Sequence, residues 1–309
     1  MTSYLLTVLG QLVPVFSLIA VGYAARRCGF PGDGFWPQLE RLVYFLLFPA
    51  LLVDKLAQAD VGGARFLLVG AAVALALTAM AAVMLALRRA FPLDGPGYTS
   101  VFQGGIRFNT YLGIAAALGI YGTRGGAVAA MVAAAMIPIV NVFCVAVLTR
   151  FAAAHASTLA VLRGIVRNPL ILACATGIAL NASGIGLPLG SAGIVEILGR
   201  AALPLGLMTV GAGLQLRTAW GHGWVLAATS ALKLLLMPLI AFGAARLVGL
   251  PRLETHVLVL FGALPTATSA YILARQLGGD HTLIATILTV ETVASAVTLP
   301  LTLLLLTLH

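Results

Sequence analysis

The amino-acid sequence predicts an all-α polytopic membrane protein with ten transmembrane helices in two inverted five-helix repeats. Three observations predict this fold: the composition, the spacing of the apolar runs and a repeat at a constant offset. Of the 309 residues, 61% are hydrophobic and only 9% are charged, and the mean hydropathy is +1.07. A soluble domain carries about a quarter charged residues on its surface, so this composition excludes a soluble enzyme.

Apolar runs between charged and turn residues define the ten predicted spans. A spanning helix needs about 20 apolar residues, and each run has about this length. The runs cover approximately residues 4–25, 37–56, 66–87, 98–121, 126–149, 160–181, 189–214, 223–247, 255–276 and 282–307. The connections left between them are short.

The loops on alternate sides of these spans differ in their Lys and Arg content. With the N-terminus outside, the inner loops hold Arg26, Arg27, Arg41, Arg88, Arg89, Arg150, Arg163, Arg167, Arg217 and Arg275, whereas the outer loops hold Lys55, Arg65, Arg124, Arg246 and Arg252. Cytoplasmic loops carry the excess of positive charge, so both termini are predicted on the periplasmic or extracellular face of the cell (inner) membrane. The net charge of +9 is thereby assigned to topology and not to nucleic-acid binding.

A repeat is visible at an offset of 155 residues. It relates Pro14 to Pro169, Gly22 to Gly177, Gly29 to Gly184 and Pro49 to Pro204. The predicted repeats are residues 1–152 and 153–309. Because each contains five spans, an odd number, the second must enter the membrane from the opposite side, as in many secondary transporters.

The fourth and ninth spans contain residues that interrupt helices. Gly104 and Gly105 each weaken a helix by roughly 1 kcal/mol relative to Ala. Pro265 lacks an N–H and clashes with the preceding turn. Adding 155 to Asn109 gives 264, so the two irregularities nearly coincide in the repeat. The alternative is that these residues only kink ordinary membrane helices.

Backbone N–H and C=O groups that lose their helical hydrogen bonds within the membrane are tolerated only inside the protein or beside a water-filled cavity. The polar residues that could satisfy them are Asn109, Thr110, Thr266, Thr268 and Ser269. Arg107 lies beside the first interruption, and half-helix N-termini carry partial positive charge. These features suit an anionic substrate such as a carboxylate. Asn141, near the helix-disturbing Pro138, is expected to line the same site.

Charged residues within spans are costly and mark functional candidates. Lys233 and Glu291 lie near the middle of the eighth and tenth spans. They could pair, Glu291 could carry a coupling proton, or Lys233 could extend to the membrane interface. Glu196 and Arg200, four residues apart, are expected to pair on one helix face. No catalytic or metal-binding motif is present, so neither an enzyme, a cofactor nor a metal site is predicted.

Several of these segments resemble the auxin efflux carrier (PIN-like) family, and the chain is similar to its bacterial-type members. The resemblance rests on Pro14 with Gly22-Tyr23, Phe48-Pro49-Ala50-Leu51-Leu52, Arg107-Phe108-Asn109-Thr110, Ala202-Leu203-Pro204-Leu205, Gly211-Ala212-Gly213-Leu214, Lys233-Leu234, Leu264 through Tyr271, and Thr298-Leu299-Pro300-Leu301. The fourth-span and ninth-span segments are the most specific.

The resemblance implies a fold similar to bile-acid symporters and sodium–proton antiporters, with broken fourth and ninth helices that cross at the substrate site. It implies a scaffold domain of about 4–56 and 160–214, a transport domain of about 66–149 and 223–307, and a homodimer formed through the scaffold. Asn109, Asn141 and the segment from Pro265 to Tyr271 would line the site. Glu291 stands where the family often has Thr, so uniport and ion coupling both stay open.

The sequence therefore predicts a secondary carrier of a small organic anion or carboxylate, auxin-like or dicarboxylate, that works by alternating access in the lipid bilayer. One alternative is a proton- or sodium-coupled symporter of organic acids that uses Glu291. A second alternative is a membrane receptor that binds its ligand without moving it. The symporter would differ from the carrier in the pH dependence of its flux. The receptor would differ in binding its ligand without any flux.

Overall fold

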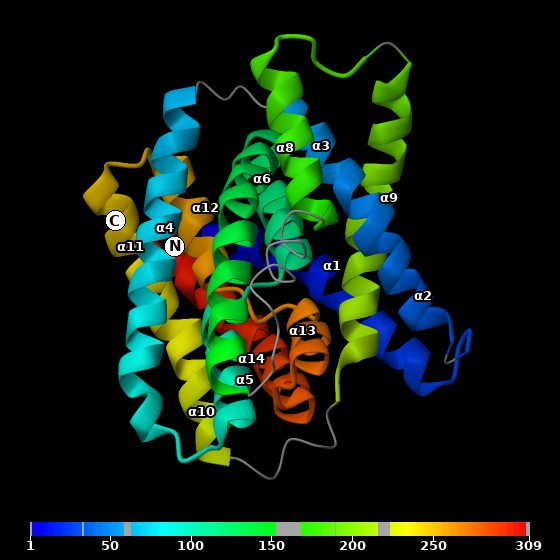
Figure 1. The fold of residues 1–309 in the computed structure, drawn as a ribbon. Coiled ribbons are helices and arrows are strands. Elements are labelled where there is room, and N and C mark those ends of the chain that lie inside the picture. Colours follow the sequence, from blue (N-terminus) through cyan, green and yellow to red (C-terminus); the bar gives the residue numbers. More distant parts are fainter. Residues whose placement is uncertain are drawn as a thin grey trace.

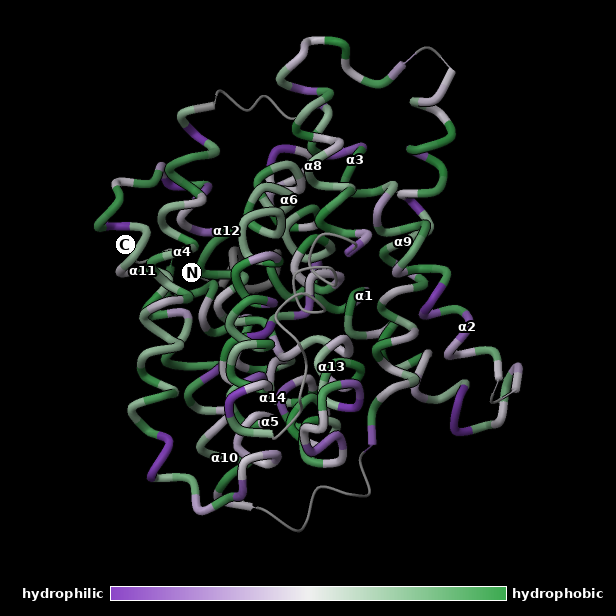
Figure 2. The backbone as a smooth tube through the Cα atoms, viewed as in Figure 1, coloured by the Kyte–Doolittle hydropathy of each residue, from purple (hydrophilic) through white to green (hydrophobic). Residues whose placement is uncertain are grey.

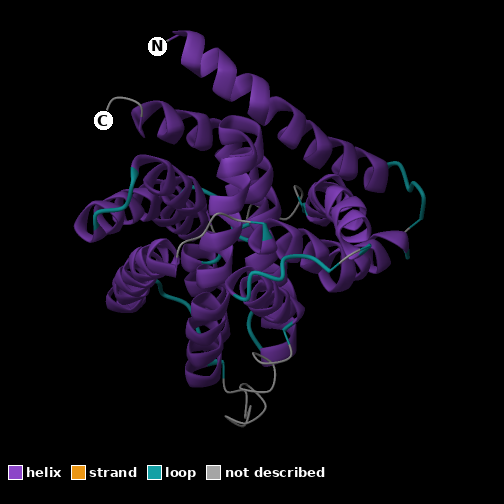
Figure 3. Ribbon diagram, turned by 90° about the horizontal axis from the view of Figure 1, so that it is seen from above, coloured by secondary structure: helices purple, strands orange, loops and turns teal. Residues whose placement is uncertain are grey.

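A computed structural model describes residues 2–32, 34–58, 63–152, 168–188, 190–215 and 223–306. Every regular element within these ranges is helical (Figures 1 and 3). Hydrophobic residues make up most of each long helix (Figure 2). Six helical stretches in this part of the chain are long and apolar enough to cross a membrane, so the protein is a polytopic membrane protein.

The first half of the chain forms α1 (Thr2–Arg27), α2 (Phe35–Leu42), the π-helical turn η1 (Val43–Leu47), α3 (Phe48–Ala57), α4 (Gly63–Ala86), the 3-10 turn η2 (Leu87–Ala90), α5 (Gly95–Ile106) and α6 (Thr110–Phe151). The second half forms α8 (Pro169–Ala182), α9 (Ser191–Gly213), α10 (Gly223–Ala231), the π-helical turn η3 (Leu232–Leu236), α11 (Met237–Val248), α12 (Arg252–Gly262), α13 (Ser269–Leu277) and α14 (His281–Leu306). The described part of each predicted apolar run falls on one of these helices or on consecutive ones; residues 160–167, 189 and 307 of these runs lie outside the described residues.

The boundary between the fourth and fifth predicted spans lies at the start of the predicted loop. The sequence predicts a loop over residues 122–125, and α6 (Thr110–Phe151) consists of two helical segments that meet at a kink at Gly122, where φ is 64°. Glycine adopts this left-handed conformation without a Cβ penalty. A single residue is therefore enough to redirect the chain.

Two pairs of helices pack so closely that glycine is required at the contact. A Cβ atom added at Gly22 of α1 would overlap the backbone of Met208 in α9, and one added at Gly177 of α8 would lie 3.3 Å from Val53 Cα in α3. Adding 155 to 22 gives 177, and subtracting 155 from 208 gives 53. The α1–α9 contact therefore maps onto the α8–α3 contact when the two halves of the chain are exchanged.

Loops predicted on the same side of the membrane meet at the same end of the molecule. At one end, the Asp280 N–H donates to the Pro96 carbonyl (3.2 Å) and the Phe91 ring stacks on Trp224 at 5.5 Å. At the other end, Arg65 at the start of α4 lies 3.3 Å from Glu254 at the start of α12. These two ends lie at the bottom and the top of Figure 1.

Candidate functional site

Two helix interruptions lie at the centre of the molecule. The first separates α5 from α6, where Arg107 and Asn109 have extended backbone conformations. The second separates α12 from α13 and contains Pro265. Both interruptions fall where the glycines and the proline of the sequence predicted them.

Hydrogen bonds join the two interruptions directly. The Asn109 N–H donates to the Pro265 carbonyl (2.8 Å), and the Thr266 hydroxyl donates to the Gly104 carbonyl (2.8 Å). The Asn109 side-chain oxygen accepts from the Leu112 N–H (3.1 Å) and so caps α6. Each interruption thus satisfies backbone groups that the other leaves free.

Two adjoining cavities reach these interruptions from one end of the molecule. The larger has a volume of about 960 Å³ and the smaller about 100 Å³. Of the predicted site residues, the larger cavity is lined by Arg107, Asn141, Thr268, Ser269 and Tyr271, and the smaller by Asn109, Thr110, Thr268 and Ser269. Pro265 and Thr266 are buried and line neither cavity. The structure therefore brings seven of the nine predicted substrate-site residues to the cavities.

Arg107, which lines the larger cavity, and Asn109, which lines the smaller one, each carry an unused hydrogen-bond donor. Arg107 is 6% exposed, and its Nη2 atom donates to Asn141 Oδ1 (2.6 Å). Its Nη1 atom and the Asn109 Nδ2 atom have no hydrogen-bond partner among the described residues. A buried donor without an acceptor costs about 1–3 kcal/mol. A carboxylate only accepts hydrogen bonds, so it is the kind of ligand that suits such donors.

The cavity wall is strongly cationic. Besides Arg107, the larger cavity is lined by Arg26, Arg41 and Arg275, and the only acidic residue along its described wall is Glu40. A cleft lined by one sign of charge concentrates ions of the opposite sign. Sequence reasoning treated the three other arginines only as topology signals and did not single out Glu40, because nothing local distinguishes a cavity-lining loop residue from a solvent-facing one.

Lys233 and Glu291 form a buried charged cluster behind the interruptions and line neither cavity. Both side chains are fully buried, which excludes extension of Lys233 to the membrane interface. Glu291 Oε2 accepts from the Thr266 N–H (2.8 Å), whereas Lys233 Nζ has no hydrogen-bond partner among the described residues. The two side chains interact electrostatically, although neither belongs to an ion pair within 4.0 Å in the described part of the chain. Glu291 therefore holds the interrupted segment that follows Pro265.

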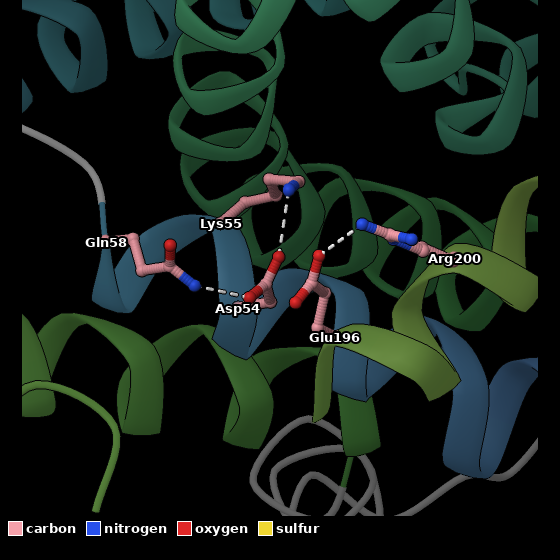
Figure 4. A network of polar contacts seen from close by, with 5 residues as sticks. All are labelled: Asp54, Lys55, Gln58, Glu196 and Arg200. Atoms are coloured by element: carbon pink, nitrogen blue, oxygen red, sulfur yellow. Dashed lines mark hydrogen bonds and ion pairs between the residues drawn. The ribbon is translucent and has the colours of Figure 1, made fainter. Parts of the chain in front are cut away.

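A second polar cluster lies on α3 and α9, away from the cavities (Figure 4). Arg200 donates to Glu196 (2.6 Å), which confirms the predicted pair, and Lys55 and Gln58 both donate to Asp54. None of these residues lines a cavity. Among the described residues, no group of three or more His, Cys, Asp or Glu side chains is placed to hold a metal ion.

Apolar helices with paired interruptions beside a cationic cavity define a multi-pass membrane transport protein. The chain belongs to the membrane transport protein family, that of the auxin efflux carriers, whose model matches residues 7–303. It is 28% identical to a Rhizobium meliloti (strain 1021) protein named "Putative malonate transporter", over 92% of this chain and 93% of that protein. It is 27% identical to an "Uncharacterized transporter" of Methanothermobacter thermautotrophicus (strain Delta H), over 96% of each chain. The family and these relatives are transporters, not enzymes.

Proposed function

We propose that the protein is a secondary carrier of a small organic anion, a monocarboxylate or dicarboxylate, that works by alternating access. The observation that carries this proposal is the larger, cationic cavity, which is lined by Arg107 and adjoins the smaller cavity that Asn109 lines. Its volume of about 960 Å³ is at the upper end of the 300–1,000 Å³ typical of small-molecule sites. The name of the Rhizobium meliloti relative makes malonate the first substrate to test.

In this proposal, ten spans form two inverted repeats, residues 1–152 and 153–309. The matching α1–α9 and α8–α3 contacts support this arrangement. These four helices belong to a scaffold domain (about 4–56 and 160–214), through which the protein forms a homodimer. The rest belongs to a transport domain (about 66–149 and 223–307) that carries both interruptions.

The cavity lies along the boundary between these two proposed domains. Glu40 and Arg41 line it from the scaffold, and Arg107 and Ser269 line it from the transport domain. Rigid-body movement of one domain against the other would transfer the site between the two faces of the membrane. Alternating access requires a water-filled space between the two domains, and the cavity lies at that position.

Buried charge gives the coupled symporter a specific observation in its favour. Lys233 and Glu291 are fully buried, and such residues often form proton relays in transporters. In this alternative Glu291 exchanges a proton or sodium ion with the site through the segment that it holds at Thr266. A flux assay with an imposed ion gradient separates the two mechanisms.

Uptake of radiolabelled malonate into proteoliposomes tests the proposal. We expect uptake by the wild type and background uptake by both Asn109→Ala and Asn109→Asp. The first variant removes the cap of α6, at a cost of about 0.5–2 kcal/mol, together with the free donor. The second keeps the capping oxygen but replaces the donor with a negative charge, so its loss of uptake reports repulsion of the anion together with the missing donor.

Asn181→Ala is the matched control, because Asn181 donates to the Ala57 carbonyl (3.1 Å) in the scaffold and lines neither cavity. It should transport malonate at nearly the wild-type rate. Unchanged uptake by Asn109→Ala would remove Asn109 from the site. Malonate binding without any flux in the wild type would support the receptor alternative.

A further inference from the structure

An aromatic ring of α6 packs into a space between α3 and α9, directly beside the smaller cavity. The ring of Tyr111, the second residue of α6, meets the ring of Phe48, the first residue of α3, edge to face with centroids 4.6 Å apart. On its other side, a Cβ atom added at Gly206 of α9 would lie 2.9 Å from Tyr111 Cγ. Only glycine at position 206 therefore leaves room for the ring where it lies.

From Tyr111, α6 leads to the end of the molecule that is opposite to the mouth of the cavities. It runs to the kink at Gly122, beside which the Tyr121 ring lies 6.0 Å from the His256 ring near the start of α12. That end also holds the ion pair of Arg65 with Glu254. We call it the closed side, because neither cavity is lined by any of the last four residues.

The packing of α6 continues beyond Tyr111 toward the closed side. A Cβ atom added at Gly119 would lie 3.2 Å from Gln11 Oε1 and 3.7 Å from the Gln11 carbonyl oxygen in α1. Neither Gly119 nor Gln11 lines a cavity, whereas Tyr111 and Phe48 both line the smaller one. Phe48 is only 1% exposed. The two rings are thus the last layer that the smaller cavity reaches before close packing begins.

These contacts join the two proposed domains. Tyr111 and Gly119 belong to the proposed transport domain, whereas Phe48, Gly206 and Gln11 belong to the proposed scaffold. Alternating access requires the site to open on the closed side as well, so movement of one domain against the other must separate these surfaces. The first contact to break next to the site is that of the Tyr111 ring.

We infer that Tyr111 is a gate residue, whose ring closes the site on the closed side while it lies between Phe48 and Gly206. This inference rests on the proposed carrier function. The ring leaves this space when the transport domain moves, and the site then opens to the closed side. Because the ring lines the smaller cavity together with Asn109, a substrate that fills this cavity contacts the gate directly.

Cysteine labelling from each side of the membrane tests the inference without knowledge of the substrate. Cys28 is the exposed native cysteine, whereas Cys144 and Cys174 are buried. The parent protein is therefore Ser269→Cys in a Cys28→Ser background, since Ser269 lines both cavities. A membrane-impermeant maleimide is applied to spheroplasts and to inside-out vesicles. We expect fast labelling of the parent from the side of the cavity mouth and slow labelling from the closed side.

Tyr111→Ala should raise the rate of labelling from the closed side at least about tenfold, because a lost contact of about 1.4 kcal/mol shifts a two-state population by that factor. Tyr111→Phe keeps the ring and should keep the parent rate. Phe102→Ala is the control for loss of a buried aromatic side chain, because Phe102 is 1% exposed and lines neither cavity. It should lower the Tm without changing the labelling rates. A parent rate from the closed side in folded Tyr111→Ala would overturn the inference.

Gly206→Ala is a second variant, which keeps every aromatic ring and decides the inference if Tyr111→Ala does not fold. The added Cβ atom should displace the Tyr111 ring and raise labelling from the closed side as well. Gly193→Ala is its matched control in α9, because no atom lies within 4 Å of a Cβ atom added there. A lower Tm for Gly206→Ala with the parent labelling rate would mean that the ring is a structural contact and not a gate.

Malonate uptake distinguishes failure of the gate from failure of the proposed substrate. Uptake by the wild type together with parent labelling of Tyr111→Ala would refute the gate alone. Absence of malonate uptake together with raised labelling of Tyr111→Ala would refute the proposed substrate and support the gate.

Discussion

Replacing Lys233 with Met tests whether Lys233 and Glu291 stabilise each other as buried charges. Both side chains are fully buried, and removal of one partner leaves the other charge without compensation. Such a loss costs about 3–5 kcal/mol in proteins, whereas removal of both charges is often nearly neutral. Glu291 would retain only the N–H of Thr266 as a hydrogen-bond donor. We therefore expect a large loss of stability from the single substitution.

The double-mutant cycle gives this expectation a measurable form. At about 2–4 °C per kcal/mol, Lys233→Met and Glu291→Gln should each lower the Tm of the detergent-solubilised protein by about 6–20 °C. The combined variant should lose less than about 5 °C, since Gln keeps an acceptor for the Thr266 N–H and no charge is left. Arg200→Met is the control, because Arg200 is 78% exposed and surface pairs contribute about 0–1 kcal/mol. A wild-type Tm for Lys233→Met, or additive losses in the cycle, would refute the reasoning.

Three further substitutions test separate features of the structure. Gly22→Ala should destabilise the protein by about 1–3 kcal/mol, because the added methyl group meets the backbone of Met208. Gly10→Ala is the control and should not destabilise it, because the space around Gly10 is open. Equal Tm values for the two variants would contradict the close packing at Gly22. Arg107→Lys should reduce malonate uptake at least about tenfold, because Lys cannot reproduce the planar donors of Arg, and wild-type uptake would remove the guanidinium from the site. An imposed pH gradient should leave wild-type uptake unchanged because Glu291 lines neither cavity, and a gradient dependence abolished in Glu291→Gln would favour the symporter.

The sequence predicts the helices and their interruptions because both have local causes. Run lengths of apolar residues locate the spans, and the lost N–H of Pro265 acts on its own turn wherever the helix packs. The repeat at an offset of 155 relates Asn109 to position 264 and so predicts interruptions at matching positions, whereas their crossing is implied by the family resemblance. The hydrogen bond between the Asn109 N–H and the Pro265 carbonyl joins the two interruptions, as that resemblance implies.

The wall of the cavity could not be predicted in the same way. Arg26, Glu40 and Arg275 come from three helices that are distant in sequence and meet only in the folded protein. An arginine that ends a span has the same local sequence whether it faces solvent or a cavity. The burial of Lys233, whose Nζ atom has no hydrogen-bond partner among the described residues, depends likewise on packing around η3, which periodicity does not reveal.

The positively charged residues that line the cavity indicate the side of the membrane to which it opens. Arg26, Arg41 and Arg275 line the cavity, and the positive-inside rule places all three on the cytoplasmic side. We therefore expect an inward-open cavity, with exposed Cys28 on the cytoplasmic face. A membrane-impermeant maleimide should label Cys28 in inside-out vesicles and not in intact spheroplasts.

Two introduced cysteines in the Cys28→Ser background separate orientation from conformation. Ile185→Cys, 69% exposed between α8 and α9 at the opposite end, should be labelled only in spheroplasts. Gln276→Cys, on the cavity wall, should be labelled only in inside-out vesicles. Labelling of Cys28 from the outside would invert the topology. Labelling of Gln276→Cys from the outside, with Cys28 still inside, would mean that the carrier rests open to the other face, because a cavity between two moving domains can open to only one side at a time.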